Sequence, residues 1–109
     1  MDRDLAGRLL ELLERWRDHP VAVRVVANGD VLITVFSGRL GARSNEKEPS
    51  LFWPVDLDGA ARGRYEKPGV YAHPQLLSEV RVHPGGFVVE FTQAGVTVNV
   101  RRLGQNHLA

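Results

Sequence analysis

The chain lacks cysteine, and none of its apolar runs approaches the ~20 residues that a membrane-spanning helix needs. Structural disulfides and zinc sites built from thiolates are therefore excluded. The first residues are charged, as in Asp2-Arg3-Asp4, which is not typical of a secretory signal peptide. We therefore expect a protein of the reducing cytoplasm that has no contact with a membrane.

An excess of charge of one sign is also missing, because 14 basic residues stand against 13 acidic ones for a formal net charge of +1. Strong non-specific binding of nucleic acid normally comes with a clear basic excess. Nucleic acid is therefore a partner that the overall charge does not favour. The composition, 43% hydrophobic and 25% charged, is that of an ordinary globular domain.

The sequence patterns of catalytic and metal sites are absent as well. No serine lies in a Gly-x-Ser-x-Gly elbow, no Gly-Lys-Ser/Thr phosphate loop occurs, and the spacing His-Glu-x-x-His is missing. Three of the four histidines, His19, His73 and His83, precede proline, which favours extended or turn backbone. We therefore expect no enzyme activity, no bound metal and no cofactor.

The 109 residues predict one domain of the α+β class. In chain order we expect a helix over residues 4–18, a hairpin over 21–37, an irregular middle segment over 38–75, antiparallel strands over 77–103 and a tail over 104–109. The helix is predicted to pack on a curved antiparallel sheet of about five strands, which can close into a small SH3/Sm-like barrel.

Apolar residues recur at helical spacing in the first of these segments. They form one stripe, which consists of Leu5, Leu9, Leu12, Leu13 and Trp16. Pro20 is expected to end the helix, because a proline disfavours helical backbone at the residue before it. The stripe predicts a helix that covers one face of the sheet.

Asn28-Gly29 separates two apolar runs, which is a strong signal for a hairpin with a type I′ turn. A two-residue turn at this place pairs Ala27 with Asp30 and Val25 with Leu32. Both faces of the hairpin are then largely apolar, whereas a half-exposed sheet alternates between apolar and polar residues. We therefore predict a central hairpin that is covered on both faces, by the helix and by other strands.

Shorter strand signals follow the hairpin. Leu51–Leu57 alternates, and Pro54 restricts this predicted strand to an edge or a bulge. Residues 71–73 predict a further fragment, and residues 77–82, 87–92 and 96–103 predict a meander with one solvated face. The last strand is expected at an edge of the sheet. Because an uncovered edge can pair with another chain, a homodimer is slightly favoured over a monomer.

Residues 9–41 resemble the opening of Sm-like small barrels, which begin with a short amphipathic helix, a strand, an Asn-Gly or Asp-Gly turn and a strongly bent second strand. The matching parts are residues 9–16, 21–26, Asn28-Gly29 and 31–40, with Ser37-Gly38 at the bend. This resemblance covers about a third of the chain and implies a ring-forming or RNA-contacting barrel. The long middle segment departs from that family, and the family's second RNA-contacting motif has no match here.

Aromatic residues, prolines and arginines gather in the middle segment. Aromatic residues and arginine dominate the hot spots of protein interfaces. We therefore hypothesise a non-enzymatic binding module whose middle segment contacts a protein partner or a second copy of the chain. Its candidate contact residues are Trp53, Tyr65, Tyr71, Arg43, Arg62, Arg64 and His73. The competing interpretation is that Phe52 or Trp53 fills the core at the open end of the sheet.

Two other functions are compatible with the same segment. A small barrel could bind single-stranded nucleic acid, with arginines such as Arg39 meeting phosphates and aromatic residues of the segment stacking on bases. A small enzyme could use His73 with Glu66 or Asp56 as an acid–base pair, although no recognisable motif accompanies them.

Overall fold

The computed structural model describes residues 2–43, 51–57 and 68–104. Within these ranges one helix precedes seven strands, so the predicted α+β class is confirmed, while the predicted number of about five strands is too low. The elements are, in chain order, α1 (Asp2–Arg15), β1 (Pro20–Ala27), β2 (Val31–Leu40), β3 (Leu51–Leu57), β4 (Gly69–Ala72), η1 (Pro74–Leu76), β5 (Leu77–Val82), β6 (Val88–Gln93) and β7 (Val96–Arg102).

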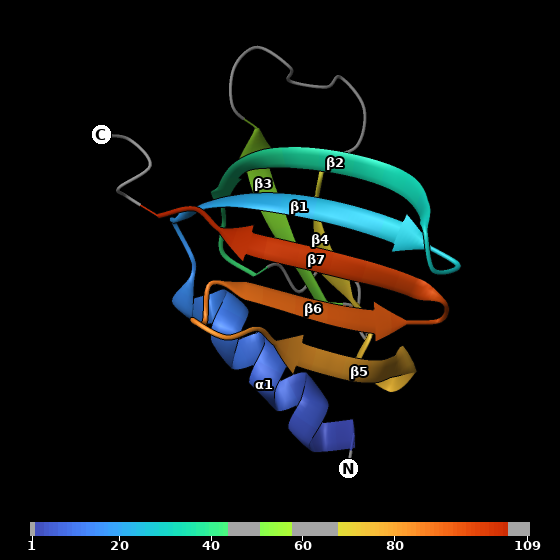
Figure 1. Cartoon of the computed structure of the whole chain (residues 1–109). Helices are drawn as coiled ribbons and strands as arrows, with labels where there is room; N and C mark the ends of the chain where they lie inside the picture. Colours follow the sequence, from blue (N-terminus) through green and yellow to red (C-terminus); the bar gives the residue numbers. More distant parts are fainter. Residues whose placement is uncertain (1, 44–50, 58–67, 105–109) are drawn as a thin grey trace.

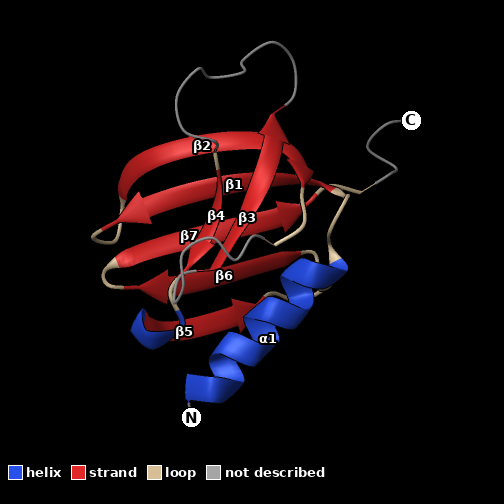
Figure 2. Cartoon of the chain, turned by 180° about the vertical axis from the view of Figure 1, so that it is seen from behind, coloured by secondary structure: helices blue, strands red, loops and turns tan. Residues whose placement is uncertain are grey.

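The strands form one antiparallel sheet in the order β4-β3-β2-β1-β7-β6-β5. The sheet curls into a half-barrel, and α1 lies against one of its faces beside β5 (Figure 1). Seen from behind, β3 and β4 cross the same face of the sheet that α1 covers (Figure 2). Because β4 and β5 stand at the two ends of the strand order, no backbone ladder joins them among the described residues.

The side chain of Gln93, at the end of β6, ties β4 to the rest of the sheet. Its Nε2 donates a hydrogen bond to the carbonyl of Tyr71 at 2.8 Å, and its Oε1 accepts one from the backbone N–H of His73 at 2.7 Å. One amide group thereby satisfies two backbone groups of β4 and the residue after it.

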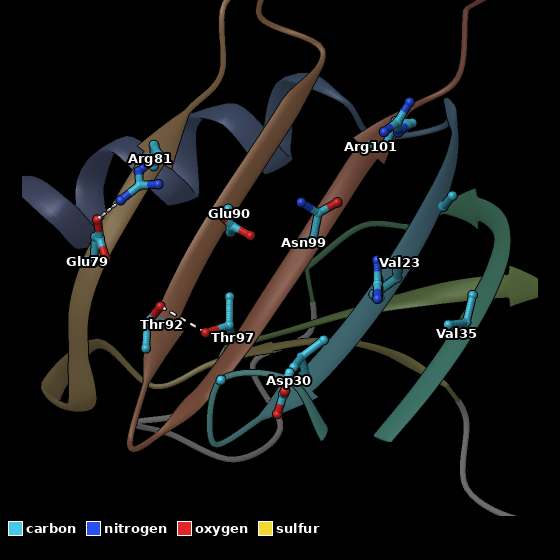
Figure 3. Close-up of a pocket in the computed structure, with 14 residues that line it drawn as sticks. Val23, Asp30, Val35, Glu79, Arg81, Glu90, Thr92, Thr97, Asn99 and Arg101 are labelled. Atoms are coloured by element: carbon cyan, nitrogen blue, oxygen red, sulfur yellow. Dashed lines mark hydrogen bonds and ion pairs between the residues drawn. The ribbon is translucent and has the colours of Figure 1, made fainter. Parts of the chain in front are cut away.

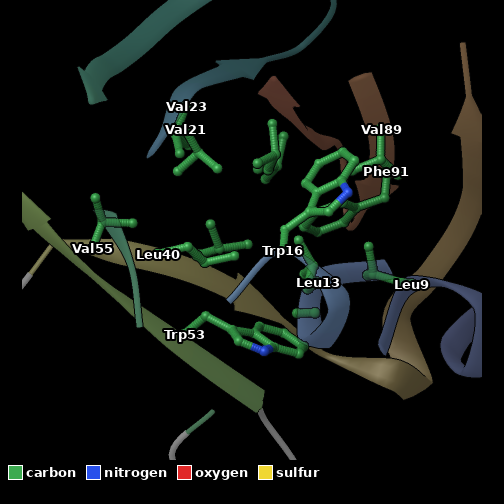
Figure 4. Packing of buried hydrophobic residues seen from close by; sticks show 14 of the residues in the cluster. Leu9, Leu13, Trp16, Val21, Val23, Leu40, Trp53, Val55, Val89 and Phe91 are labelled. Atoms are coloured by element: carbon green, nitrogen blue, oxygen red, sulfur yellow. The ribbon is translucent and has the colours of Figure 1, made fainter. Parts of the chain in front are cut away.

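The hydrophobic core lies between the curled sheet, α1 and the β3–β4 pair (Figure 4). Its largest fully buried members are Trp16, Trp53 and Phe91. The predicted helical stripe contributes Leu9, Leu13 and Trp16. The strands supply the other buried residues: Val21, Val23, Leu40, Val55, Val70, Ala72, Leu77, Val89, Val98 and Val100. Burying one large apolar side chain contributes roughly 1.5–3 kcal/mol, so this cluster is the main source of stability.

Helix α1 ends at Arg15, earlier than the predicted boundary at residue 18. Asp18 has a positive φ of 71°, and its backbone N–H donates to the carbonyl of Leu40 at 2.7 Å. The helix therefore ends where the chain turns to meet β2, before the conformational restriction from Pro20 takes effect.

β1 and β2 form the predicted hairpin, and its turn has the expected positive φ values, 52° and 95°, at Asn28-Gly29. The predicted register is wrong, because the loop also includes Asp30 and Ala27 pairs with Val31. Further along, β2 carries one extra residue at Ile33, which is a β-bulge. A bulge is not visible in a pattern of apolar residues, so the turn alone could not fix the register.

Both strands predicted in the middle segment are part of the sheet, as β3 and β4, but β4 covers residues 69–72 and not the predicted 71–73. β3 has the predicted bounds, but it is not an edge strand, since residues 55–57 pair with β2 and residues 51–54 pair with β4. Pro54 lies where the pairing changes, and its carbonyl accepts a hydrogen bond from the N–H of Gly41 at 2.7 Å. Residues 44–50 and 58–67 of this segment lie outside the described residues.

β5, β6 and β7 form the predicted meander, and its last turn, Ala94-Gly95, has positive φ at both residues. The polar residues of the predicted solvated face, such as Arg101, point away from the core (Figure 3). β6 begins at Val88, one residue later than predicted, and the half-exposed ring of Phe87 has its centroid 4.7 Å from the guanidinium carbon of Arg102. The predicted edge position of the last strand is also wrong, since β7 pairs with β1 and with β6.

Candidate interaction surface

Trp53 is predicted to be a contact residue, but the structure places it in the core. Its side chain is fully buried, and its Nε1 donates a hydrogen bond to Oε2 of Glu14 at 3.2 Å. The indole therefore fixes β3 against α1 and is not accessible to a partner (Figure 4). The competing interpretation, in which an aromatic residue of the middle segment fills the core, is correct for Trp53.

Phe52 and Tyr71 form an aromatic pair on the opposite face of β3 and β4. Their ring centroids are 4.3 Å apart with the planes inclined by 31°. Tyr71 is half exposed, as expected for a contact residue. Gly69 lies beneath the pair, where an added Cβ would meet the Phe52 ring and the Trp53 carbonyl. A residue without a side chain is therefore required at the start of β4.

The other predicted contact residues do not form one cluster with this pair. His73 is half-buried after β4, and its buried ring Nδ1 has no hydrogen-bond partner among the described residues. Arg43 is half-buried beside α1, where it lines a small hollow with residues of the helix. The remaining candidates, Arg62, Arg64 and Tyr65, lie outside the described residues.

The acid–base pair of His73 and Asp56 is not brought together. His73 follows Ala72, which pairs with Leu51, whereas Asp56 lies five residues further along β3. At a rise of about 3.3 Å per residue, the two residues are roughly 15–20 Å apart. Glu66, the other predicted partner, lies outside the described residues. Within the described ranges, no three side chains of His, Asp or Glu gather closely enough to hold a metal ion.

An apolar surface lies along β2, where the sequence predicts burial. Four of the seven large hydrophobic residues that are exposed in the described chain belong to this strand, with exposed fractions between 52% and 59%: Val31, Leu32, Ile33 and Val35. β3 pairs only with Gly38–Leu40 of β2, so residues 31–37 have no described strand on that side. We call residues 31–37 the open edge of β2. The prediction that both faces of the hairpin are covered is wrong for this part of β2.

The open edge lacks most of the features that keep natural sheet edges from pairing. Such edges are usually blocked by charged residues, by proline or by covering elements. Residues 31–37 read Val-Leu-Ile-Thr-Val-Phe-Ser and contain neither charge nor proline. The bulge at Ile33 is the one irregularity that the pairing with β1 shows in this segment. The edge is therefore suited to accept another strand.

The outer face of the sheet, away from the core, carries an open hollow of about 630 Å³ (Figure 3). Three arginines and three acidic residues line it: Arg24, Arg81, Arg101, Asp30, Glu79 and Glu90. An ion pair joins Arg81 to Glu79, and the hydroxyls of Thr92 and Thr97 lie 3.1 Å apart. No aromatic residue is among the described residues that line the hollow. Its balanced charge and lack of a stacking surface do not favour nucleic acid.

Comparison with protein-family models, with curated proteins and with solved structures finds no match. One feature of the sequence does indicate the open edge of β2. The five residues from Val31 to Val35 carry no charge, and the hairpin has no face that is mainly polar. No helix in the described part of the chain is long and apolar enough to cross a membrane.

Proposed function

We propose that this chain is a non-enzymatic interaction module that binds another polypeptide by adding a strand to the open edge of β2. The observation that supports the proposal is the seven-residue stretch of uncharged strand that has no described neighbour on the side away from β1. In strand addition, the free backbone N–H and C=O groups of an edge pair with the incoming segment, and side chains on alternate faces supply specificity. The expected occupant is an extended, uncharged, apolar segment.

The energetic gain comes mainly from the half-exposed aliphatic side chains. Complete burial of such a side chain is worth roughly 1.5–3 kcal/mol, so covering the exposed half of each contributes about 1 kcal/mol. Backbone hydrogen bonds add to this, and the loss of translational and rotational freedom on association opposes it. We therefore expect affinities in the micromolar range for a single added strand.

The middle segment has a supporting part in this proposal. Trp53 anchors β3, and the Phe52–Tyr71 pair on the other face of β3 and β4 presents the half-exposed ring of Tyr71. We propose that Tyr71, Arg43 and His73 also contact the bound polypeptide. Tyr71→Ala tests this most directly, because this side chain is exposed and its removal leaves the core unchanged.

Selection of random heptapeptides displayed on phage, with the immobilised protein as target, tests the proposal. We expect enrichment of uncharged sequences rich in Val, Ile and Leu, and loss of their binding to Val35→Lys, because a lysine on an edge opposes strand addition. Gln75→Lys is the matched control, since it adds the same charge at an exposed residue of η1. Peptides that bind all three proteins equally well would show that β2 is not the site.

The competing proposal is single-stranded nucleic-acid binding by a small SH3/Sm-like barrel. Arg24 and Arg101 of the outer face support it, because neither forms an ion pair with a described residue. Its signature is binding of a fluorescent oligonucleotide that weakens as salt rises. Absence of such binding at low ionic strength removes this alternative.

A further inference from the structure

The open edge of β2 is complementary to itself. When an uncharged apolar strand pairs antiparallel with its own copy about its middle, apolar residues meet apolar residues and no like charges face each other. We infer that the strand added at this edge is β2 of a second copy of the chain, with a two-fold axis near Thr34, the middle of residues 31–37. This inference rests on the proposed function and names its partner.

The charges at the two ends of the open edge favour the antiparallel direction. Asp30 precedes the edge and Arg39 follows it, and both are exposed. The Arg39 guanidinium donates to the backbone carbonyl of Asp18, but it forms no ion pair with a described residue, although Asp56 lies opposite it on β3. In an antiparallel pair, the Asp30 end of one copy lies beside the Arg39 end of the other. A parallel pair would bring like charges together.

The two-fold arrangement also explains how the open edge of β2 can be covered without the growth of longer assemblies. A symmetric contact uses the same surface of both copies, so it closes at two subunits. The axis of an antiparallel strand pair is perpendicular to the sheet, which places the outer hollows of both copies on the same side of one continuous sheet. The contact is smaller than the ~800 Å² per partner of a typical stable complex, so we expect a dimer that dissociates on dilution.

Single cysteines test the arrangement, because the natural chain has none and each variant carries one thiol. Thr34→Cys and Val35→Cys place the thiol near the axis. Val31→Cys places it at one end of the same edge, and Gln75→Cys places it on an exposed residue of η1 as a control. Each protein is oxidised with copper phenanthroline and analysed on non-reducing gels, and the wild type is measured by light scattering over a dilution series.

We expect the mass of the wild type to double at high concentration and to return to that of one chain on dilution. Directly opposed residues of an antiparallel pair have Cα atoms about 4.5–5.5 Å apart, within the range that a disulfide spans. Thr34→Cys or Val35→Cys is therefore expected to form covalent dimers at least about tenfold faster than Gln75→Cys and Val31→Cys. The reason is that the dimer holds the two thiols near its axis close together, which raises their effective concentration.

Two results would overturn the inference. One is a single-chain mass at every concentration together with crosslinking of Thr34→Cys and Val35→Cys at the rate of Gln75→Cys. The other is equally rapid crosslinking of Val31→Cys, which would indicate parallel or irregular association. Neither result tests the proposed function, because strand addition is measured separately by the binding of the selected heptapeptides. Peptides that bind a monomeric protein would leave strand addition intact with a different partner.

Discussion

β2 and β7 have similar apolar residues and opposite surroundings. Val98 and Val100 of β7 are buried, because they face the core and their strand is paired on both sides, by β1 and β6. In β2, the run from Val31 to Val35 is about half exposed, because its outer side has no described neighbour. An apolar run thus indicates that a strand has to be covered, but it does not indicate which chain supplies the cover.

The sequence predicts the reverse, with the last strand at an edge of the sheet and the hairpin of β1 and β2 covered on both faces, and this error has a physical reason. β7 alternates valines with Thr97, Asn99 and Arg101, which marks one solvated face, and its position at the end of the meander suggests an edge. However, alternation of apolar and polar residues indicates only which face of the sheet is exposed to solvent. Whether a strand lies at an edge depends on which other strands pair with it. The contact between β7 and β1 joins the two ends of the chain, and no local pattern specifies it.

The largest expected effect separates the two strands directly. Val100→Lys places a charge in the core and is expected to reduce the free energy of unfolding by at least about 4 kcal/mol. Val35→Lys is expected to change it by less than about 0.5 kcal/mol, because the side chain remains in water. Urea unfolding followed by circular dichroism at low protein concentration measures both values.

Val100→Ala extends this comparison if the lysine variant does not fold, with an expected loss of about 2 kcal/mol from the cavity. Equal losses for Val35→Lys and the variants of Val100 would mean that β2 is covered within a single chain. The contrast between the two strands would then be wrong.

A second contrast concerns the aromatic residues on the two faces of the β3–β4 pair. Trp53→Ala is expected to cost about 3–5 kcal/mol, because it removes a fully buried indole. Tyr71→Ala is expected to cost less than about 1 kcal/mol, since the ring is half exposed and packs on Phe52 outside the core. Thermal unfolding of the two variants ranks them, and the opposite order would return Trp53 to the list of contact residues.

The parts of the fold that the sequence specifies are those with local signals. The helical spacing of Leu9, Leu13 and Trp16 predicted the face of α1 that is buried, and the alternation in Leu51–Leu57 predicted β3 with its bounds. The meander of β5 to β7 followed from apolar residues at every second position and from Gly-containing turns. In each case neighbours in the sequence decide the structure.

The parts that failed depend on non-local contacts. The extra residue at Ile33 shifts the register of the hairpin, and only the pairing of β1 with β2 reveals it. Pro54 is accommodated inside the sheet because β3 changes partner there, which requires the positions of β2 and β4. Among the predicted contact residues, Tyr71 is exposed and Trp53 is buried, and residue type alone does not separate these two outcomes.

Self-association provides the next test of the β2 surface. Val35→Lys places two lysines near the proposed axis and removes apolar contact, so we expect the dissociation constant of the dimer to rise about 100-fold. Analytical ultracentrifugation over a dilution series measures this change. Gln75→Lys should leave the constant unchanged, and a similar rise in that control would mean that net charge, and not the edge, governs association.

A smaller effect is expected where the side chain of Gln93 in β6 holds β4. Gln93→Ala removes both hydrogen bonds and leaves two backbone groups to water, at a cost of about 1–2 kcal/mol. Gln93→Glu keeps the acceptor for the N–H of His73 and loses the donor to Tyr71, so an intermediate cost is expected. Hydrogen exchange of the His73 amide should accelerate in the order wild type, Gln93→Glu, Gln93→Ala. Equal rates in all three would show that β4 is held by its pairing with β3 alone.

The smallest effect comes from the charges that flank the open edge. Asp30→Arg places a cation beside Arg39 of the partner copy and is expected to weaken the dimer by a factor of about two to five, because exposed ion pairs contribute less than about 1 kcal/mol. Exchanging both charges, in Asp30→Arg with Arg39→Asp, should restore the affinity, since the two ends again have opposite signs. Urea unfolding of Arg39→Asp shows whether the lost contact with the carbonyl of Asp18 affects the fold. If the double variant is as weak as Asp30→Arg, the two ends do not meet, and the antiparallel arrangement of β2 against its copy loses its electrostatic support.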